Sequence, residues 1–254
     1  MSEGLEQVPP VCSTITRILY HSIDDVIGEH FREGQTDRPI SLSDVYSILL
    51  ADRIDVFFSQ LESTSTSNAR TECNRTMELL RWITGRPVVG FEQGKYRIEG
   101  GVEEALDALA ETLHHISLQW TERQFELAVV GYGDSVPVKR TGIPLLPDST
   151  GVAGLFDLAV QYSGCDRDRL VAVQPVFIPL EQVDSDLSIR IVRDNCGLGA
   201  TRAFVTSAYL QSKLSNQPLH FSYGTGGVSR SSTNLTRNRK VDVTITIKAA
   251  REHG

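Results

Sequence analysis

The sequence predicts an α/β protein of the α+β type, in which a helical N-terminal region precedes a mixed sheet with helices on one face. Three observations lead to this prediction. Apolar residues recur at helical spacing through residues 1–87 without a strong strand pattern. A strand, a helix and a strand follow in residues 88–137, and a helix and two strands occupy residues 195–249. We therefore expect two domains, 1–87 and 88–254. The two parts of the second domain are separated by a segment at about 138–194, which is called the insertion below because of a resemblance to a known family.

Length and composition are those of a globular protein. At about 150 residues per domain, 254 residues suit one large or two small domains. Apolar residues make up 40% of the chain and charged residues 22%, which is enough apolar material for a packed core. The formal net charge of −7 disfavours non-specific binding to nucleic acid.

Three helices are expected in the N-terminal region, because apolar residues recur there at helical spacing. The second helix is expected to start at the N-cap sequence Ser41-Leu42-Ser43-Asp44, and the third to stop at Gly85-Arg86-Pro87. We interpret the apolar positions as core. They are Ile15, Ile18, Leu19, Ile23, Val26 and Ile27 in the first helix, Val45, Ile48, Leu49, Ile54, Phe57, Phe58 and Leu61 in the second, and Met77, Leu79, Leu80, Trp82 and Ile83 in the third.

The second domain opens with a predicted strand over 88–98 and a predicted helix over 102–117. The helix carries one apolar stripe that suits packing on a sheet, namely Val102, Leu106, Leu109, Leu113 and Ile116. A second strand is expected over 124–130, and it leads into Gly131-Tyr132-Gly133-Asp134.

The insertion is expected to be ordered, because a structureless loop of that length is rare inside a compact domain. It contains a possible helix at 155–160 and two expected strands at 170–173 and 187–191. It could cover or reshape a site, or it could merely decorate the fold.

The last part of the chain is expected to form a helix over 198–214, a strand over 219–224 and a glycine- and serine-rich loop. The terminal strand over 240–248 alternates Val241, Val243, Ile245 and Ile247 with Asp242, Thr244, Thr246 and Lys248. This alternation predicts that one face of the strand is buried.

Two motifs in this part resemble those of a known family. Asn195-Cys196-Gly197-Leu198-Gly199-Ala200-Thr201-Arg202-Ala203 resembles the N-x-x-L-(S/G)-x-x-R-A signature of the OmpA-like domain, and Asn238-Arg239-Lys240-Val241-Asp242 resembles its N-R-(R/K)-V-(E/D) signature. Asp134 falls on the aspartate of the family's G-H-T-D strand end, although Tyr132-Gly133 stand in place of His-Thr. The resemblance covers roughly 88–137 and 195–249, in the family's order.

The resemblance implies a binding module that attaches bacterial envelope proteins to peptidoglycan. The family recognises a diamino acid whose ammonium and carboxylate sit on one carbon, using an aspartate for the ammonium and an arginine for the carboxylate. By resemblance these roles fall on Asp134 and Arg202, with Asn195 near the helix start and Asn238 and Arg239 beside the site. The alternative is a protein that kept the fold for protein contacts, made through the insertion and the N-terminal helices. In that case Asp134 and Arg202 form an internal pair or never meet, and Asn238 and Arg239 have a purely structural role.

Compartment is left open by the sequence. The resemblance implies the cell envelope or periplasm. No apolar run approaches the length of a membrane span, and the acidic N-terminus lacks the apolar core of a secretory signal, so a cytoplasmic protein or a chain without its export segment are both compatible. The four cysteines lack metal-site spacing. Cys165 and Cys196 could form a disulfide in an oxidising compartment, but the sequence favours two buried free thiols.

Catalytic motifs are missing from the sequence. The adjacent His114 and His115 are expected to face different directions on a helix, which is unsuited to a shared metal. The glycine turns at 149–151 and 224–227 lack the lysine of a phosphate loop, and neither G-x-S-x-G nor H-E-x-x-H occurs. We therefore predict a protein that is not an enzyme and that needs no cofactor.

Overall fold

The chain forms two compact units. Unit 1 comprises Met1–Pro87, Asp107–Gln124 and Thr246–Gly254, and unit 2 comprises Val88–Leu106 and Phe125–Ile245. The computed structural model describes residues 10–32, 40–41, 54–64, 70–83, 90–133, 138–139, 141–145, 174–182, 191–215, 217, 219–228 and 239–249.

The helices of unit 1 confirm the predicted helical N-terminal region. They are α1 (Pro10–Arg32), α3 (Ile54–Thr64), α4 (Arg70–Ile83) and the later part of α5 (Gly101–Gln119), and the first three contact one another. α1 buries one apolar side of four residues spaced four apart, namely Ile15, Leu19, Ile23 and Ile27. The predicted stripe of α5 is buried as well, at Leu106, Leu109, Leu113 and Ile116.

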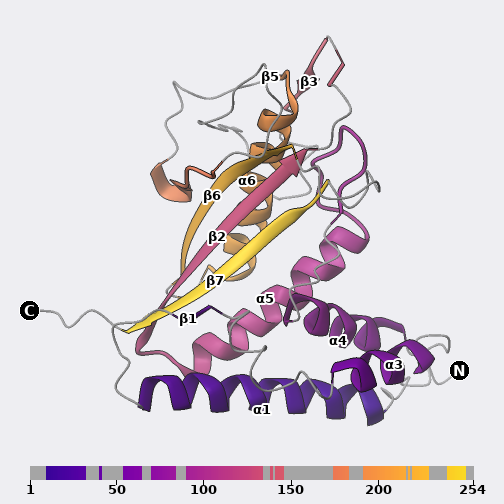
Figure 1. Cartoon of the computed structure of the whole chain (residues 1–254), viewed down its shortest axis with the longest axis vertical. Coiled ribbons are helices and arrows are strands. Elements are labelled where there is room, and N and C mark those ends of the chain that lie inside the picture. The colour runs from indigo at the N-terminus through magenta and orange to yellow at the C-terminus, as the bar shows by residue number, and fades with distance from the viewer. Residues whose placement is uncertain are drawn as a thin grey trace, which may run out of the picture. The chain divides into compact units, whose positions relative to one another are not determined.

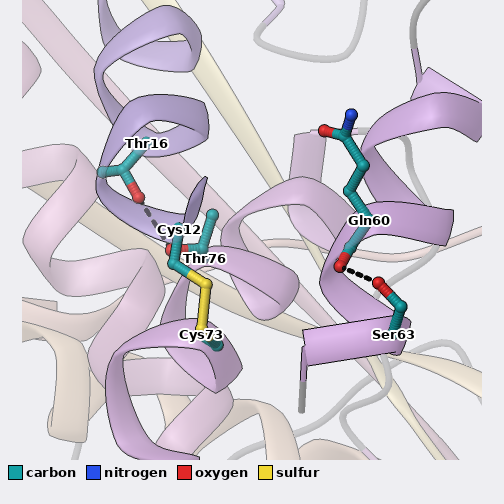
Figure 2. Close-up of a disulfide and its surroundings, with 6 residues drawn as sticks. All are labelled: Cys12, Thr16, Gln60, Ser63, Cys73 and Thr76. Atoms are coloured by element: carbon teal, nitrogen blue, oxygen red, sulfur yellow. Dashed lines mark hydrogen bonds between the residues drawn. A yellow bond between two sulfur atoms is a disulfide. The ribbon is translucent and has the colours of Figure 1, made fainter. Parts of the chain in front are cut away.

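A disulfide joins α1 to α4 in unit 1. Cys12 and Cys73 are bonded, with their Cα atoms 5.2 Å apart, and the hydroxyl groups of Thr16 and Thr76 share a hydrogen bond of 2.7 Å one turn further along (Figure 2). This disulfide was not predicted from the sequence. Cys196 is also disulfide-bonded, so the prediction of a free thiol there is wrong, while Cys165 lies outside the described residues.

Unit 1 also contains a short strand that was not expected. β1 (Ile40–Ser41) pairs antiparallel with the end of β7, matching Ile40 with Ile247 and Ser41 with Thr246. The predicted helix start at Ser41-Leu42-Ser43-Asp44 stays a prediction, because Ser41 is the last residue of β1 and residues 42–53 lie outside the described residues. Two residues are too few to show strand alternation, so only the pairing partner reveals this strand.

A mixed sheet forms the centre of unit 2 and confirms the α+β class. Its strands lie in the order β7 (Val241–Ala249), β2 (Arg123–Gly133), β6 (Leu219–Val228) and β4 (Ile178–Pro179). β2 and β6 are parallel, and β4 runs antiparallel to β6. α6 (Asn195–Lys213) lies behind the sheet in Figure 1 and packs on β6. The core between them includes Phe125, Leu127, Val129, Ala203, Tyr223, Val241 and Ile245.

α6 starts with a side-chain cap. The carboxylate of Asp194 accepts a 2.7 Å hydrogen bond from the backbone N–H of Gly197, which satisfies one of the free donors at the helix start. The helix therefore begins at Asn195, three residues before the predicted 198. All residues from Asn195 to Leu210 are buried.

Other boundaries in unit 2 also differ from the predictions. Residues 90–100 form no strand apart from a single bridge between Gly90 and Lys240, so the predicted strand 88–98 is wrong over its described part. β6 continues past Gly224 to Val228.

Few residues of the predicted insertion are described. β3 (Ile143–Pro144) and β5 (Ile191–Val192) pair in a separate two-stranded sheet, and the short helix η2 (Leu180–Gln182) follows β4. The predicted elements at 155–160 and 170–173 lie outside the described residues, and Ile191 is the one described residue of the predicted strand 187–191.

Candidate functional site

Two glycines bring α6 directly onto strand β2. A Cβ at Gly131 would overlap the carbonyl oxygen of Gly199, and a Cβ at Gly199 would lie 2.7 Å from the carbonyl oxygen of Gly131. Only the absence of a side chain at both positions permits this close approach of the two backbones. The first turns of α6 are thereby held against the end of β2.

The start of α6 meets the last residue of β2. A Cβ at Gly133 would lie 2.7 Å from both the Cβ and the carbonyl oxygen of Asn195, and Asn195 is 3% exposed. Asn195 therefore packs on the strand end and is not open to solvent. The Gly131-Tyr132-Gly133 sequence admits the helix because the two residues that face α6 are glycines.

The start of β7 completes the same edge of unit 2. The backbone N–H of Tyr132 donates to the carbonyl of Lys240 over 2.9 Å, and that of Phe91 donates to the carbonyl of Arg239 over 2.7 Å. Residues 131–133, 194–202 and 239–242 thus converge, and we call these three segments the motif edge. They belong to the three sequence motifs that resemble the OmpA-like family.

Arg202 lies inside the motif edge and is 0% exposed. Its guanidinium group donates from Nε to the carbonyl of Lys95 (3.0 Å), from Nη1 to the carbonyl of Tyr132 (2.7 Å) and from Nη2 to the carbonyl of Glu92 (3.2 Å). The guanidinium carbon also lies 5.2 Å from the centre of the Phe91 ring. The resemblance assigns Arg202 to a ligand carboxylate, and the structure surrounds its side chain with protein.

The structure describes some of the other residues named by the resemblance and not others. Arg239 is partly exposed and its carbonyl is engaged by Phe91. Asp134, which directly follows Gly133, and Asn238 both lie outside the described residues. The expected approach of Asp134 to Arg202 therefore stays a prediction.

The motif edge also carries a polar cluster that was not predicted from the sequence. Tyr132 lies on the sheet face away from α6, where its ring covers Gly226. Lys240 Nζ lies 2.8 Å from both carboxylate oxygens of Asp242 and 5.2 Å from the centre of the Tyr132 ring. The i, i+2 spacing of Lys240 and Asp242 in a predicted strand could have indicated this pair, since such residues share a face.

The Tyr132 phenol has a raised pKa. Burial is the main cause, and the negative charge of Asp242, with its hydrogen bond to the phenol, raises the pKa further. A neutral phenol is therefore favoured more in the folded protein than in the unfolded chain. This contribution to stability is complete below pH 10.0, the ordinary pKa, and is lost as the pH rises from 10.0 through the higher folded value.

We expect the free energy of unfolding to fall above pH 10.0 by a smaller amount in Tyr132→Phe than in the wild type, because the variant has no phenol at this position to ionise. Denaturant unfolding at a series of pH values from neutral upward measures the difference. Tyr20→Phe provides a comparison, because burial also raises the pKa of Tyr20 in unit 1. A phenolate difference spectrum that places the Tyr132 transition at or below pH 10.0 would contradict the raised pKa.

His115 of unit 1 contacts two residues of α1. His115 Nε2 lies 3.3 Å from Asp24 Oδ2, and its ring stacks on Tyr20 with 4.2 Å between ring centres. Among the described residues no group of three or more His, Cys, Asp or Glu side chains could hold a metal ion. None of the helices in the described ranges is long and apolar enough to cross a membrane.

Comparison with protein-family models, with curated proteins and with solved structures finds no match. The likeness to OmpA-like domains therefore rests on the three motifs and on their placement in unit 2.

Proposed function

We propose that this chain is a non-catalytic binding module of the bacterial cell envelope, which attaches an envelope protein or complex to peptidoglycan at the motif edge. The observation that carries the proposal is the convergence of three motifs from distant parts of the sequence. Residues 131–133, 194–202 and 239–242 meet through the Gly131–Gly199 and Gly133–Asn195 contacts and the Tyr132–Lys240 hydrogen bond. An OmpA-like domain would need this convergence to build its ligand site.

The chemistry of the proposed ligand suits the residues at this edge. A diamino acid in the peptidoglycan stem peptide presents a free ammonium, which a carboxylate such as that of Asp134 can accept in a charge-assisted hydrogen bond. Bonds of this kind contribute roughly 1.5–3 kcal/mol each. One such bond, together with contacts to other groups at this edge, suits a weak and reversible anchor.

The Cys12–Cys73 disulfide supports a location in the periplasm. Disulfides form and persist in oxidising compartments, of which the bacterial periplasm is one, and are rare in the cytosol. No free cysteine occurs in the part of the chain that the structure describes. The disulfides thus favour the envelope over the cytoplasmic alternative.

A second candidate function is protein binding through the insertion at 138–194. Three apolar side chains of this region are exposed in unit 2, namely Val176 (50%), Phe177 (45%) and Ile191 (42%). Val176 and Phe177 are neighbours in the chain, and exposed apolar side chains of this kind favour contact with another protein. In this case the OmpA-like fold would serve an assembly without binding peptidoglycan.

Sedimentation with insoluble peptidoglycan that contains diaminopimelate tests the two candidates. Wild-type protein is expected to sediment with it, and Asp134→Asn is expected to weaken binding ~30-fold or more, because an unpaired desolvated charge costs about 2–5 kcal/mol. Glu122→Gln is the matched control, since it removes the same charge from an exposed turn in unit 1.

Each outcome of this experiment favours one candidate. Equal sedimentation of wild type, Asp134→Asn and Glu122→Gln would indicate non-specific adsorption and remove the support for a diamino-acid site. If the wild type stays in solution, the protein-binding candidate is favoured, and Phe177 becomes the first residue to replace in a search for partners.

A further inference from the structure

We propose that Arg202 is a positioning residue of the motif edge and not a direct contact of the ligand, an inference that rests on the proposed function for its ligand. The resemblance assigns Arg202 to the ligand carboxylate. The structure engages all three nitrogens of its guanidinium group with backbone carbonyls of the protein itself, at 2.7–3.2 Å. At 0% exposure, the side chain offers no free donor surface to a carboxylate arriving from solvent.

The carbonyl partners of Arg202 belong to two segments that are far apart in the sequence. Tyr132 lies two residues before Asp134, at the end of β2, whereas Glu92 and Lys95 flank a tight turn 107–110 positions away from Arg202. Charge-assisted bonds from one planar guanidinium fix the relative positions of these segments. Arg202 therefore holds the strand end that directly precedes Asp134 in the sequence.

The turn at Glu92–Lys95 depends on this support. Lys95 N–H donates to the Glu92 carbonyl over 3.0 Å, and Gly94 has a φ of 69°, a conformation that glycine adopts without strain. The side chains of Glu92, Gln93 and Lys95 are exposed, while Phe91 and Tyr96 on either side are buried. The turn thus presents its side chains to solvent and its carbonyls to Arg202.

These bonds restrict how a ligand can meet the motif edge. A ligand carboxylate could reach the fully buried guanidinium of Arg202 only if the protein groups around it moved. In a site built around a fixed arginine, the ligand instead meets the groups that the arginine positions, among them the end of β2.

NMR spectroscopy of the full chain with meso-diaminopimelate as the probe tests this inference. In wild-type protein the Nε–H signal of Arg202 should be protected from solvent exchange. It should keep its chemical shift when diaminopimelate is added, while backbone amides of the motif edge shift. A guanidinium signal that shifts with these amides, or that loses its protection, would overturn the proposal, because the guanidinium would then leave the carbonyls for the ligand.

A second measurement needs no ligand and uses the variant Arg202→Lys, which retains the positive charge but loses the planar guanidinium group. The guanidinium signal that is missing from the spectrum of this variant is the signal of Arg202. We expect amide exchange at Lys95 and Tyr132 to accelerate by about tenfold or more, since each bond to a charged donor contributes more than the ~1.4 kcal/mol that corresponds to tenfold. Arg97→Lys is the matched control, in the same segment but with a side chain that is 52% exposed. Unchanged exchange in Arg202→Lys would refute the positioning role.

The two proposals fail in different ways. If diaminopimelate moves no signal and wild-type protein does not sediment with peptidoglycan, the proposed function is wrong, and the ligand-free exchange rates still decide whether Arg202 positions the edge. Should Arg202→Lys not fold, the Arg202 signal of the wild type is assigned through its own side-chain and backbone resonances, and its exchange protection then decides the same point.

Discussion

Gly131→Ala is expected to lower the free energy of unfolding of unit 2 by about 3 kcal/mol or more, since overpacking a tight core typically costs 1–3 kcal/mol and here the obstacle is backbone. The added Cβ would overlap the carbonyl oxygen of Gly199 and lie 3.0 Å from the backbone nitrogen of Ala203. Neither atom can move aside by rotating a side chain. The helix and strand must therefore separate, which removes the Gly133–Asn195 contact and loosens the motif edge.

Gly101→Ala is the matched control for this prediction. Gly101 begins α5 within unit 2, and a Cβ there would meet nothing within 4 Å. The substitution is expected to be neutral or stabilising by up to about 1 kcal/mol, because alanine restricts the unfolded chain more than glycine does. Denaturant unfolding monitored by circular dichroism measures both variants, with hydrogen exchange of α6 to locate the change. Equal stability of Gly131→Ala and Gly101→Ala would show that α6 does not pack on β2 at the distance that requires glycine.

Removal of the Cys12–Cys73 disulfide is expected to lower the stability of unit 1 by about 4 kcal/mol. The bond closes a loop between cysteines 61 positions apart, and a cross-link of that span removes conformational entropy from the unfolded chain by roughly this amount. The double variant Cys12→Ala with Cys73→Ala removes the bond without leaving a free thiol. Denaturant unfolding of the double variant and the wild type measures the loss, with hydrogen exchange of α1 and α4 to assign it to unit 1.

The neighbouring threonines supply a control at the same helix pair. Thr16→Val with Thr76→Val removes the 2.7 Å hydrogen bond between α1 and α4 but keeps the covalent link. This change is expected to cost only about 1 kcal/mol, the usual net contribution of one neutral hydrogen bond. If the cysteine double variant is as stable as the threonine double variant, the disulfide contributes little. Packing of Leu19, Leu80 and their neighbours would then already hold α1 and α4 together.

Elements that bury one regular face could be predicted from the sequence alone. The four-residue spacing of Ile15, Leu19, Ile23 and Ile27 predicted α1, and the alternation of Val241, Val243, Ile245 and Ile247 predicted β7. In both cases the period of the element and the burial of one side produce the pattern directly. The α+β class, which depends only on the order of such elements, could be predicted for the same reason.

Irregular segments could not be predicted in this way. Phe91, Tyr96 and Ile98 look like strand residues because they are apolar, and they are indeed buried, but the Glu92–Lys95 turn interrupts any strand there. The turn is supported by the guanidinium of Arg202, more than a hundred positions away. Apolar content therefore indicated burial correctly and the backbone conformation wrongly.

The candidate site, too, was predictable in part from the sequence and in part only from the structure. The sequence by itself determined which residues resemble the family's motifs, since the resemblance around Gly131, Arg202 and Lys240 depends on residue types and spacing alone. Only the tertiary structure decided what they contact. It paired Cys12 with Cys73, brought the motifs together and enclosed Arg202 among backbone carbonyls. The physical reason is that every residue carries the same carbonyl group, so a contact to backbone has no signature in the sequence and becomes visible only when the chain is folded.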